Sequence, residues 1–427
     1  MTMTDSEESP KNRLRAVVEQ CLRREMAPDA IFPSPEEDCV EGGALDSMAW
    51  VSFVRCVEDA TGVRDFGERM TDQPRSLRTM LAVLESSQGR EERAATPVSA
   101  PRPATATGIA GWAHAVGSSV VEAAEVEREF RLPPGKIRKG AGIESVARLG
   151  RDEDEVSFCA AVCDAALARA GWDIGEVDWL IATSETYSQF PSLGASLHAR
   201  LLAGETCGVL DIGGACVGLL NCLSAAQALL LAGRARHVLV VSGDVHSRVL
   251  TPERVKGEFG GLFGDGASAF LLRAAEGGEA EALYRLGEFR FGCSSIYASA
   301  LRIGLAPDQG IALMFEGEAL ARAAVEQMER VIEDVELRSG MTRADASAFV
   351  IHQPNPRLVE LLTRYAGIPP EKIPVVAKTN GNLGSSTCGV ALSMALTEHA
   401  PKPVEQRGPI LLAAVGPGML WGGGVLY

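Results

Sequence analysis

The sequence lacks long apolar runs, and its positive charge is outnumbered by its negative charge. Its 427 residues include 41 Lys and Arg against 56 Asp and Glu, a formal net charge of −15. Nucleic acids and anionic membrane surfaces would repel this charge, so neither is expected as a main partner. No stretch reaches the length of a bilayer span, and the opening MTMTDSEESP is too polar and acidic for a secretory signal or a basic transit peptide. We therefore expect a cytoplasmic protein that acts on small molecules or proteins.

Cysteines at metal-ligand spacing are also missing. The ten cysteines are scattered along the chain, and Cys207, Cys216 and Cys222 do not form a zinc-ligand pattern. In a chain of this length, the expectation is a set of reduced core cysteines with one reactive thiol among them. We expect no metal.

The start of the chain is predicted to be a small all-helical unit. Apolar residues recur at helical spacing in 12–26, 46–62 and 76–86. The following stretch, 89–107, is rich in Ala, Pro, Thr and Arg without a periodic apolar face, which is typical of a flexible linker. We therefore place one domain at 11–88 and a second at 108–427.

The second domain shows the pattern of a parallel-sheet α/β architecture. Short apolar runs such as VDWLIATS, HVLVVSGD and ASAFLLRA alternate with Ala- and Leu-rich helices. A comparable progression follows, with a helix at 318–336, a strand at AFVIHQ and terminal strands at GPILLAAV and GGGVLY. This weak internal repeat predicts two related halves, 108–280 and 281–427.

Ser47 is the candidate functional residue of the helical unit. In GGALDSMAW it follows Asp46 at the start of a predicted helix, which by itself describes an ordinary N-cap. The stretch from Lys11 to Ser86 resembles an acyl carrier protein, a small four-helix domain, in length, helix order and the position of its Asp-Ser motif. The resemblance implies a covalent 4'-phosphopantetheine on Ser47, attached by a phosphopantetheinyl transferase. A degenerate structural domain is the alternative.

Three residues of the second domain could form a nucleophilic site. Cys216 lies in DIGGACVGLL, where a Gly-Gly turn leads from a strand into a helix. A helix N-terminus lowers a thiol pKa, and such a turn presents a side chain to a cavity. His352 in AFVIHQPNPRL and Asn382 in TNGNLGSSTCGVAL could complete the site. A buried core cysteine, a hydrogen-bonded histidine and a turn asparagine are the simpler interpretations of each alone.

Residues 108–427 resemble the ketoacyl-ACP synthase III enzymes of the thiolase superfamily. Six motifs in order carry the resemblance: IATSETYSQFPS, DIGGACVGLL, LFGDGASAFLL, IHQPNPRLVELL, NGNLGSS and GPGMLWGGGVLY. The resemblance implies an α/β thiolase fold of two related halves in αβαβα layers, and a homodimer. The activity it implies is decarboxylative Claisen condensation of a Cys-bound acyl group with a malonyl-type thioester on a carrier protein.

The same resemblance assigns roles to individual residues. Cys216 takes the acyl group, and His352 and Asn382 bind the malonyl thioester and stabilise the enolate formed when carbon dioxide leaves. The backbone N–H groups of Cys216 and Gly418 match an oxyanion hole. Three further residues match the substrate path: Phe190 in an acyl tunnel across a dimer interface, and Asn355 and Arg357 at the pantetheine entrance.

The chain departs from the family where acyl-CoA would bind. Relatives that take acyl-CoA carry a Trp and Arg residues around the adenine and phosphates, whereas this chain has Lys136, Gly140 and Glu144. A missing aromatic ring and an added carboxylate weaken the case for CoA binding. We therefore expect the acyl donor to arrive on a carrier protein.

Glu185 in ATSETYS is a second departure, because synthase III sequences usually have an uncharged residue there. It resembles the catalytic glutamate of hydroxymethylglutaryl-CoA synthases and is a candidate acid or base; a solvated loop carboxylate is the simpler interpretation. Aldol condensation and acyl transfer to a hydroxyl, an amine or a carrier thiol stay open, as does a non-enzymatic carrier and docking scaffold. Fusion of a carrier to a synthase favours a specialised polyketide or fatty-acid-like pathway.

Overall fold

The computed structural model describes residues 10–71, 73–86, 106–255, 257–275, 284–294, 297, 299–305 and 311–427. The chain forms two compact units, Met1–Ser99 with Phe315–Ala323, and Ala100–Met314 with Ala324–Tyr427. All but the last two residues of the linker predicted at 89–107 lie outside the described residues, as does the boundary predicted between residues 280 and 281.

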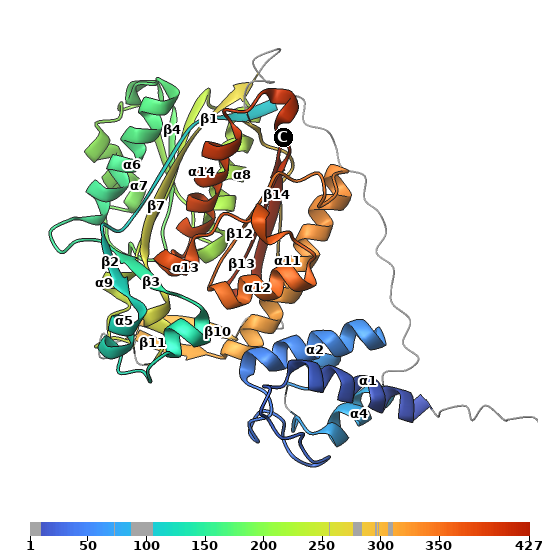
Figure 1. Ribbon diagram of the computed structural model, residues 1–427. Helices are drawn as coiled ribbons and strands as arrows, with labels where there is room; N and C mark the ends of the chain where they lie inside the picture. The colour runs from blue at the N-terminus through green and yellow to red at the C-terminus, as the bar shows by residue number, and fades with distance from the viewer. Residues whose placement is uncertain are drawn as a thin grey trace, which may run out of the picture. The chain divides into compact units, whose positions relative to one another are not determined.

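Residues 10–86 of the first unit form four helices (Figure 1). They are α1 (Pro10–Glu25), α2 (Ser47–Thr61), α3 (Phe66–Arg69) and α4 (Leu77–Glu85). The helices predicted at 12–26, 46–62 and 76–86 are confirmed; α3 was missed because four residues are too few to show a periodic pattern. The apolar faces form a core of their own, which includes Trp50 and Phe53.

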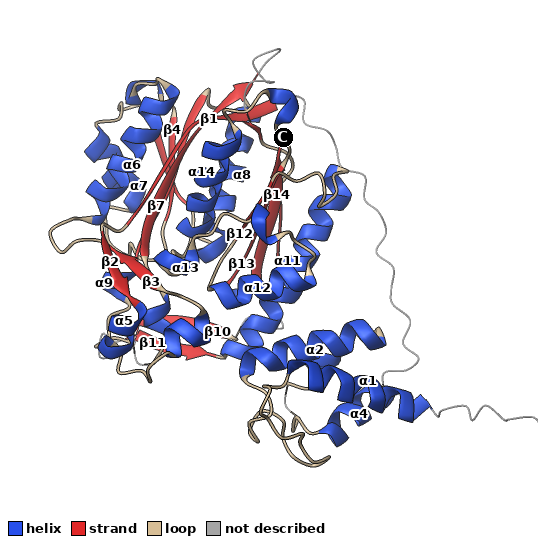
Figure 2. Cartoon of the chain, in the orientation of Figure 1, coloured by secondary structure: helices blue, strands red, loops and turns tan. Residues whose placement is uncertain are grey.

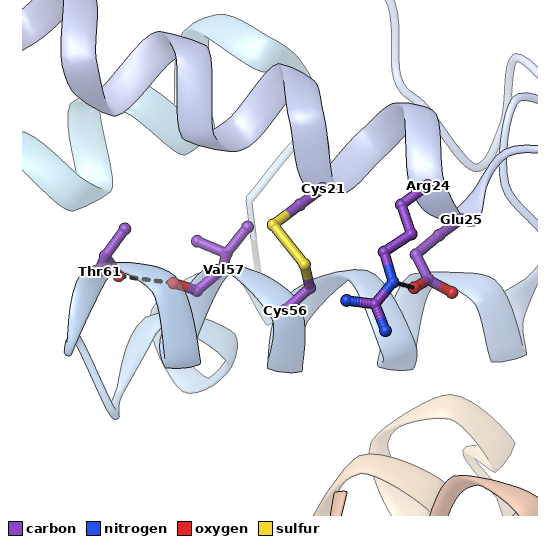
Figure 3. The surroundings of a disulfide bond; sticks show 6 residues. All are labelled: Cys21, Arg24, Glu25, Cys56, Val57 and Thr61. Carbon is purple, nitrogen blue, oxygen red and sulfur yellow. Dashed lines mark hydrogen bonds and ion pairs between the residues drawn. A yellow bond between two sulfur atoms is a disulfide. The ribbon is translucent and has the colours of Figure 1, made fainter. Parts of the chain in front are cut away.

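A disulfide joins the first two helices of this unit. Cys21 on α1 is bonded to Cys56 on α2, with their Cα atoms 5.8 Å apart (Figure 3). The expectation that the cysteines are reduced is wrong for this pair. The partners are 35 residues apart in the sequence, and only the packing of α1 against α2 brings them within bonding geometry. The eight other cysteines are free, and Cys216 is among the buried ones.

The second unit contains two main sheets, with strand orders β5-β4-β6-β7-β1-β8 and β12-β13-β14-β9. Their strands are β1 (Ala106–Val116), β4 (Trp179–Thr183), β5 (Gly208–Asp211), β6 (His237–Val245), β7 (Asp265–Ala275), β8 (Tyr284–Arg285), β9 (Arg290–Cys293), β12 (Ala348–Ile351), β13 (Ile410–Gly416) and β14 (Leu420–Leu426). Two short pairs accompany them, β2 (Ser119–Glu122) with β3 (Ser145–Arg148), and β10 (Leu301–Leu305) with β11 (Ile311–Phe315).

Both sheets are mixed, so the prediction of a parallel sheet is wrong in part. Strand β4 is parallel to β5 and β6, and β12 is parallel to β13. Strand β7 runs antiparallel to both β6 and β1, and β14 runs antiparallel to β13. A central strand buried on both faces is apolar throughout whichever way its neighbours run, so apolar runs such as ASAFLLRA do not report direction.

Helices and sheets alternate in the predicted αβαβα layers (Figures 1 and 2). The helices of the second unit are α5 (Ala123–Glu129), α6 (Glu155–Ala170), α7 (Leu193–Leu201), α8 (Gly218–Leu231), α9 (His246–Val249), most of α11 (Gly317–Ser339), α12 (Pro356–Tyr365), α13 (Ala377–Asn380) and α14 (Ser386–His399). Helices α8 and α14 lie between the two sheets, α6 and α7 pack on the outer face of the larger sheet, and α11 packs on β14. None of the helices in the described ranges is long and apolar enough to cross a bilayer.

Candidate active site

Cys216 lies where the central helix α8 begins. It occupies one turn of 3-10 helix, η3 (Ala215–Val217), between β5 and α8. Ala215 has a φ of +48°, a left-handed conformation that costs a residue with a Cβ about 1–3 kcal/mol and is typical of functional turns. A Cβ added to Gly416 at the end of β13 would lie 3.3 Å from the Cβ of Cys216. The strained turn therefore places the cysteine against the second sheet.

The surroundings of Cys216 favour the neutral thiol. Burial raises the pKa of the thiol well above its usual value, and the neighbouring carboxylate of Glu185 raises it further. The expectation that a helix N-terminus lowers this pKa is wrong here, because desolvation and an adjacent anion both disfavour the thiolate. Cys216 therefore needs a base to act as a nucleophile.

Glu185 and His246 form a charged pair beside Cys216. Oε2 of Glu185 lies 3.6 Å from Nε2 of His246, and their side chains are only 17% and 4% exposed. The simpler interpretation of Glu185 as a solvated loop carboxylate is therefore wrong. Burial lowers the pKa of His246, but the carboxylates of Glu185 and Asp244 outweigh this effect and raise it to about 9. Sequence reasoning missed His246, whose only signal is its place directly after the buried run of β6.

Asp244 connects the loops around this pair. The side chain is fully buried, and its carboxylate accepts hydrogen bonds from the Glu185 N–H at 2.6 Å, the Ser385 hydroxyl at 2.6 Å and the Ser386 N–H at 3.1 Å. Burial and the charge of Glu185 raise the pKa of Asp244 to about 6. Asp244 thus holds the loop after β4 and the start of α14 at the end of β6.

Asn382 lies in the loop between α13 and α14, over the Glu185–His246 pair. Its Oδ1 accepts hydrogen bonds from the Gly384 N–H at 3.0 Å and the Thr387 hydroxyl at 3.3 Å, so the NH₂ group is the end of the amide left for a ligand. Gly384 has a φ of +58°, and a Cβ added there would lie 2.6 Å from Cε1 of His246. The glycine allows this close approach of the loop.

His352 follows β12 and is held as a neutral imidazole. The backbone N–H of His352 donates to the Ala413 carbonyl of β13 at 3.0 Å, and the residue is 2% exposed. Nδ1 is buried without a hydrogen-bond partner. Burial lowers the pKa of His352 to about 4, although the charge of Glu185 acts in the opposite direction. The influence of Glu185 on both His352 and Cys216 indicates that the three side chains share one site.

A cavity of about 960 Å³ adjoins the site. Glu185, Thr186 and His246 contribute polar groups to its wall, and the apolar wall includes Leu250, Phe263, Leu301 and Leu313. Ala215, next to Cys216, and Gly418 also line it. Gly418 lies in η8 (Pro417–Met419) with a φ of +78°, so the predicted oxyanion-hole glycine faces the same cavity as the cysteine turn.

The other predicted residues of the substrate path lie outside this cavity lining. Phe190 is 98% exposed. Asn355 caps α12, accepting a hydrogen bond from the Leu358 N–H at 2.9 Å, and the Arg357 guanidinium donates to the Lys139 carbonyl at 3.2 Å. The roles predicted for Phe190, Asn355 and Arg357 stay predictions.

The CoA-region residues form ion pairs within the chain. Oε1 of Glu144 lies 3.3 Å from Nζ of Lys378, and Nζ of Lys136 lies 2.8 Å from Oε2 of Glu258.

Among the residues that the structure describes, no group of three or more His, Cys, Asp or Glu side chains could hold a metal ion.

In the first unit, Ser47 is exposed at the first residue of α2. Asp46 caps this helix, because its carboxylate accepts hydrogen bonds from the Met48 N–H at 3.0 Å and the Ala49 N–H at 2.8 Å. The interpretation of Ser47 as an ordinary N-cap is therefore wrong, and its hydroxyl is open to solvent.

The αβαβα layers, with a cysteine at the start of a central helix, define a thiolase-type fold. The family descriptions that match are 3-oxoacyl-[acyl-carrier-protein (ACP)] synthase III, over residues 210–288, and its C-terminal part, over residues 337–427. The β-ketoacyl-[acyl-carrier-protein] synthase III of Granulibacter bethesdensis is 31% identical over 326 residues, which are 74% of this chain and 98% of that protein. The chain therefore belongs to the β-ketoacyl-[acyl-carrier-protein] synthase III family.

Solved structures show the same similarity. The 3-oxoacyl-[acyl-carrier-protein] synthase III of Aquifex aeolicus is 25% identical with a TM-score of 0.67, over 75% of this chain and 99% of that one. The priming β-ketosynthase of the R1128 polyketide biosynthetic pathway is 26% identical with a TM-score of 0.67, over 78% of this chain and 98% of that one.

Proposed function

We propose that the protein joins an acyl group carried on Cys216 to the enolate of a malonyl-type thioester. The products are a β-ketoacyl thioester and carbon dioxide. The single observation that carries this proposal is the site itself, where Cys216, a neutral His352 and the free amide NH₂ of Asn382 lie in one buried region of a synthase III fold. Two hydrogen-bond donors beside a thioester are what an enolate oxygen needs when carbon dioxide leaves.

The acyl donor in this proposal arrives on a carrier protein. Lys136 and Glu144 are paired with residues of the same chain, and no aromatic ring replaces the tryptophan of CoA-binding relatives. Asp46, not Ser47, caps α2. The exposed Ser47 hydroxyl therefore suits attachment of 4'-phosphopantetheine by a phosphopantetheinyl transferase. The helical unit would then act as the protein's own acyl carrier. The likeness to a polyketide priming ketosynthase supports a specialised polyketide or fatty-acid-like pathway.

We further propose that the protein acts as a homodimer. Phe190 is 98% exposed, so its ring is free to contact a second chain. The role implied for it, closing the acyl tunnel of the partner, would explain this exposure.

The test uses the full chain, loaded on Ser47 by a phosphopantetheinyl transferase and then given acyl and malonyl thioesters. Peptide mass spectrometry is expected to find pantetheine on Ser47 and an acyl group on Cys216, and the product is expected to carry a new β-keto group with one carbon dioxide released per turnover. A Cys216→Ala variant is the control. A chain that takes no acyl group from any thioester would leave only the carrier and docking scaffold.

The buried Glu185–His246 pair favours a second candidate function, aldol condensation or acyl transfer at the same cysteine. A charged acid–base pair can deprotonate a bound acyl group or an incoming hydroxyl or amine without decarboxylation. Product analysis separates the reactions, because only the Claisen route releases carbon dioxide and leaves a β-keto group.

A further inference from the structure

Three buried polar atoms in the site around Cys216 have no hydrogen-bond partner. They are Oε1 of Glu185, Nε2 of His246 and Nδ1 of His352. The other ring nitrogen of His246, Nδ1, lies 3.1 Å from the Gly264 carbonyl, which can only accept, so Nδ1 carries a proton and Nε2 faces Glu185. An unsatisfied buried polar atom costs about 1–3 kcal/mol, so its retention beside a nucleophile points to a role in the reaction.

Three groups near Cys216 are possible acceptors for its proton. Asp244 is engaged through both carboxylate oxygens by hydrogen bonds from the chain. Only burial and the charge of Glu185 act on the His352 imidazole, so this ring does not interact with the Cys216 thiol. Glu185 has one oxygen without such a bond, and its carboxylate interacts with the Cys216 thiol. The geometry therefore leaves Glu185 as the acceptor.

We propose that Glu185 accepts the proton of Cys216 when the acyl donor loads and passes it to the departing thiol, with His246 as the residue that positions Glu185. This inference rests on the proposed function, because it concerns the first half-reaction of that scheme. Glu185 would be a catalytic residue that touches the nucleophile, whereas His246 acts only through Glu185.

The step balances without a redox partner. The sulfur of Cys216 forms a bond to the thioester carbonyl carbon, and the bond from that carbon to the donor sulfur breaks. The proton moves from Cys216 to Glu185 and then to the donor thiolate, so the products are acyl-Cys216 and a free donor thiol. Glu185 ends as the carboxylate with which it began.

His246 keeps Glu185 anionic between turnovers. Asp244 and Asp265 face His246 together with Glu185, so three carboxylates favour its protonated form. Glu185 faces His246, His352 and Cys216, and of these only His246 carries a positive charge at neutral pH. Loss of that charge would leave Glu185 buried beside a neutral imidazole and a thiol, where burial favours its protonated form.

The test compares two reactions of Cys216 in the full chain: alkylation by iodoacetamide and single-turnover acylation by an acyl thioester, both followed by intact mass. Glu185→Gln removes the anion that disfavours the thiolate, so alkylation at a given pH is expected to become faster. Acylation is expected to fall about 100-fold, because general-base catalysis typically contributes 10²–10⁴-fold. Faster acylation, or unchanged acylation, in Glu185→Gln would overturn the assignment.

A second substrate and matched variants separate proton transfer from disturbance of the fold. An acyl nitrothiophenyl ester has a leaving thiolate that needs no proton, so the defect of Glu185→Gln is expected to shrink for this donor; an equal defect for both donors contradicts the proposal.

Glu185→Asp is expected to restore part of the acylation rate, and His246→Gln to lower it less than Glu185→Gln does. The exposed carboxylate of Glu253 provides the control, since Glu253→Gln should change neither reaction. Failure of the wild-type chain to take any acyl group overturns the proposed function itself.

Discussion

The His352 imidazole and the Asn382 amide approach the site from different elements, β12 and the loop before α14. Neither contacts the thiol through a hydrogen bond in the structure, whereas Glu185 interacts with it. This division of contacts fits two half-reactions, in which acyl loading depends on Glu185 and malonyl decarboxylation depends on His352 and Asn382.

We predict that His352→Ala and Asn382→Ala each lower decarboxylation of a malonyl thioester by about 10²–10³-fold, the usual loss when one donor to a developing oxyanion is removed. Acylation of Cys216 should change only a few-fold. Release of carbon dioxide and formation of acyl-enzyme, measured separately by mass spectrometry, check the split. Equal loss in both half-reactions would argue against this division of roles.

The two buried histidines predict opposite effects of pH. Burial lowers the pKa of His352 to about 4 from 6.5, so its contribution to stability is present above pH 6.5 and is lost as pH falls toward 4. His246, with a pKa raised to about 9, stabilises the fold below pH 6.5 and loses this effect as pH rises through 9. Because the His352 imidazole stays neutral until pH nears its pKa, decarboxylation should stay constant from about pH 8 to pH 5 and fall near pH 4. The melting temperature is measured in parallel. A fall near pH 6.5 would contradict a depressed His352 pKa.

At the scale of elements, the packing of α8 against β4 sets the position of Cys216. A Cβ added to Gly218, the first residue of α8, would lie 2.3 Å from the Oγ1 of the buried Thr183. In the loop that leads into this helix, a Cβ added to Gly213 would meet nothing within 4 Å. The two glycines thus form a matched pair.

We predict that Gly218→Ala destabilises the second unit by about 1–3 kcal/mol through overpacking, and lowers Cys216 acylation by displacing the cysteine turn. Gly213→Ala should leave both nearly unchanged. Thermal unfolding and single-turnover acylation of the full chain provide the measurements. Equal effects of the two substitutions would show that contact with Thr183 is not the cause.

The Cys21–Cys56 disulfide is expected to stabilise the helical unit. It closes a loop of 35 residues between α1 and α2. In the chain-entropy model, a loop of this length lowers the conformational entropy of the unfolded chain and so raises the free energy of unfolding by about 4 kcal/mol. The double variant Cys21→Ser, Cys56→Ser should therefore lose amide protection in α1 and α2 in hydrogen exchange, while β6 and α8 keep theirs. Unchanged protection would mean that helix packing alone holds the unit.

At the scale of the whole molecule, a helical unit that acts as the proposed carrier would meet the synthase unit of its own chain at an effective concentration that does not depend on dilution. We predict that a chain loaded with acyl-pantetheine on Ser47 transfers the acyl group to Cys216 at a rate constant unchanged over a 10-fold dilution. A mixture of Ser47→Ala and Cys216→Ala chains, which can transfer only between chains, is the comparison. A rate proportional to concentration in the wild-type chain would show that transfer occurs between separate molecules.

The sequence by itself predicted the alternation of strands and helices in the second unit and pointed to Cys216, His352 and Asn382 as candidate site residues, while the αβαβα class followed from the family resemblance. These features depend on local patterns and motifs, whose residues lie close together in the sequence. The tertiary structure alone decided the mixed direction of the sheets, the Cys21–Cys56 bond, the raised pKa of the Cys216 thiol and the Glu185–His246 pair. Each of these results from residues far apart in the sequence, and burial and distance between such residues arise only when the layers pack together.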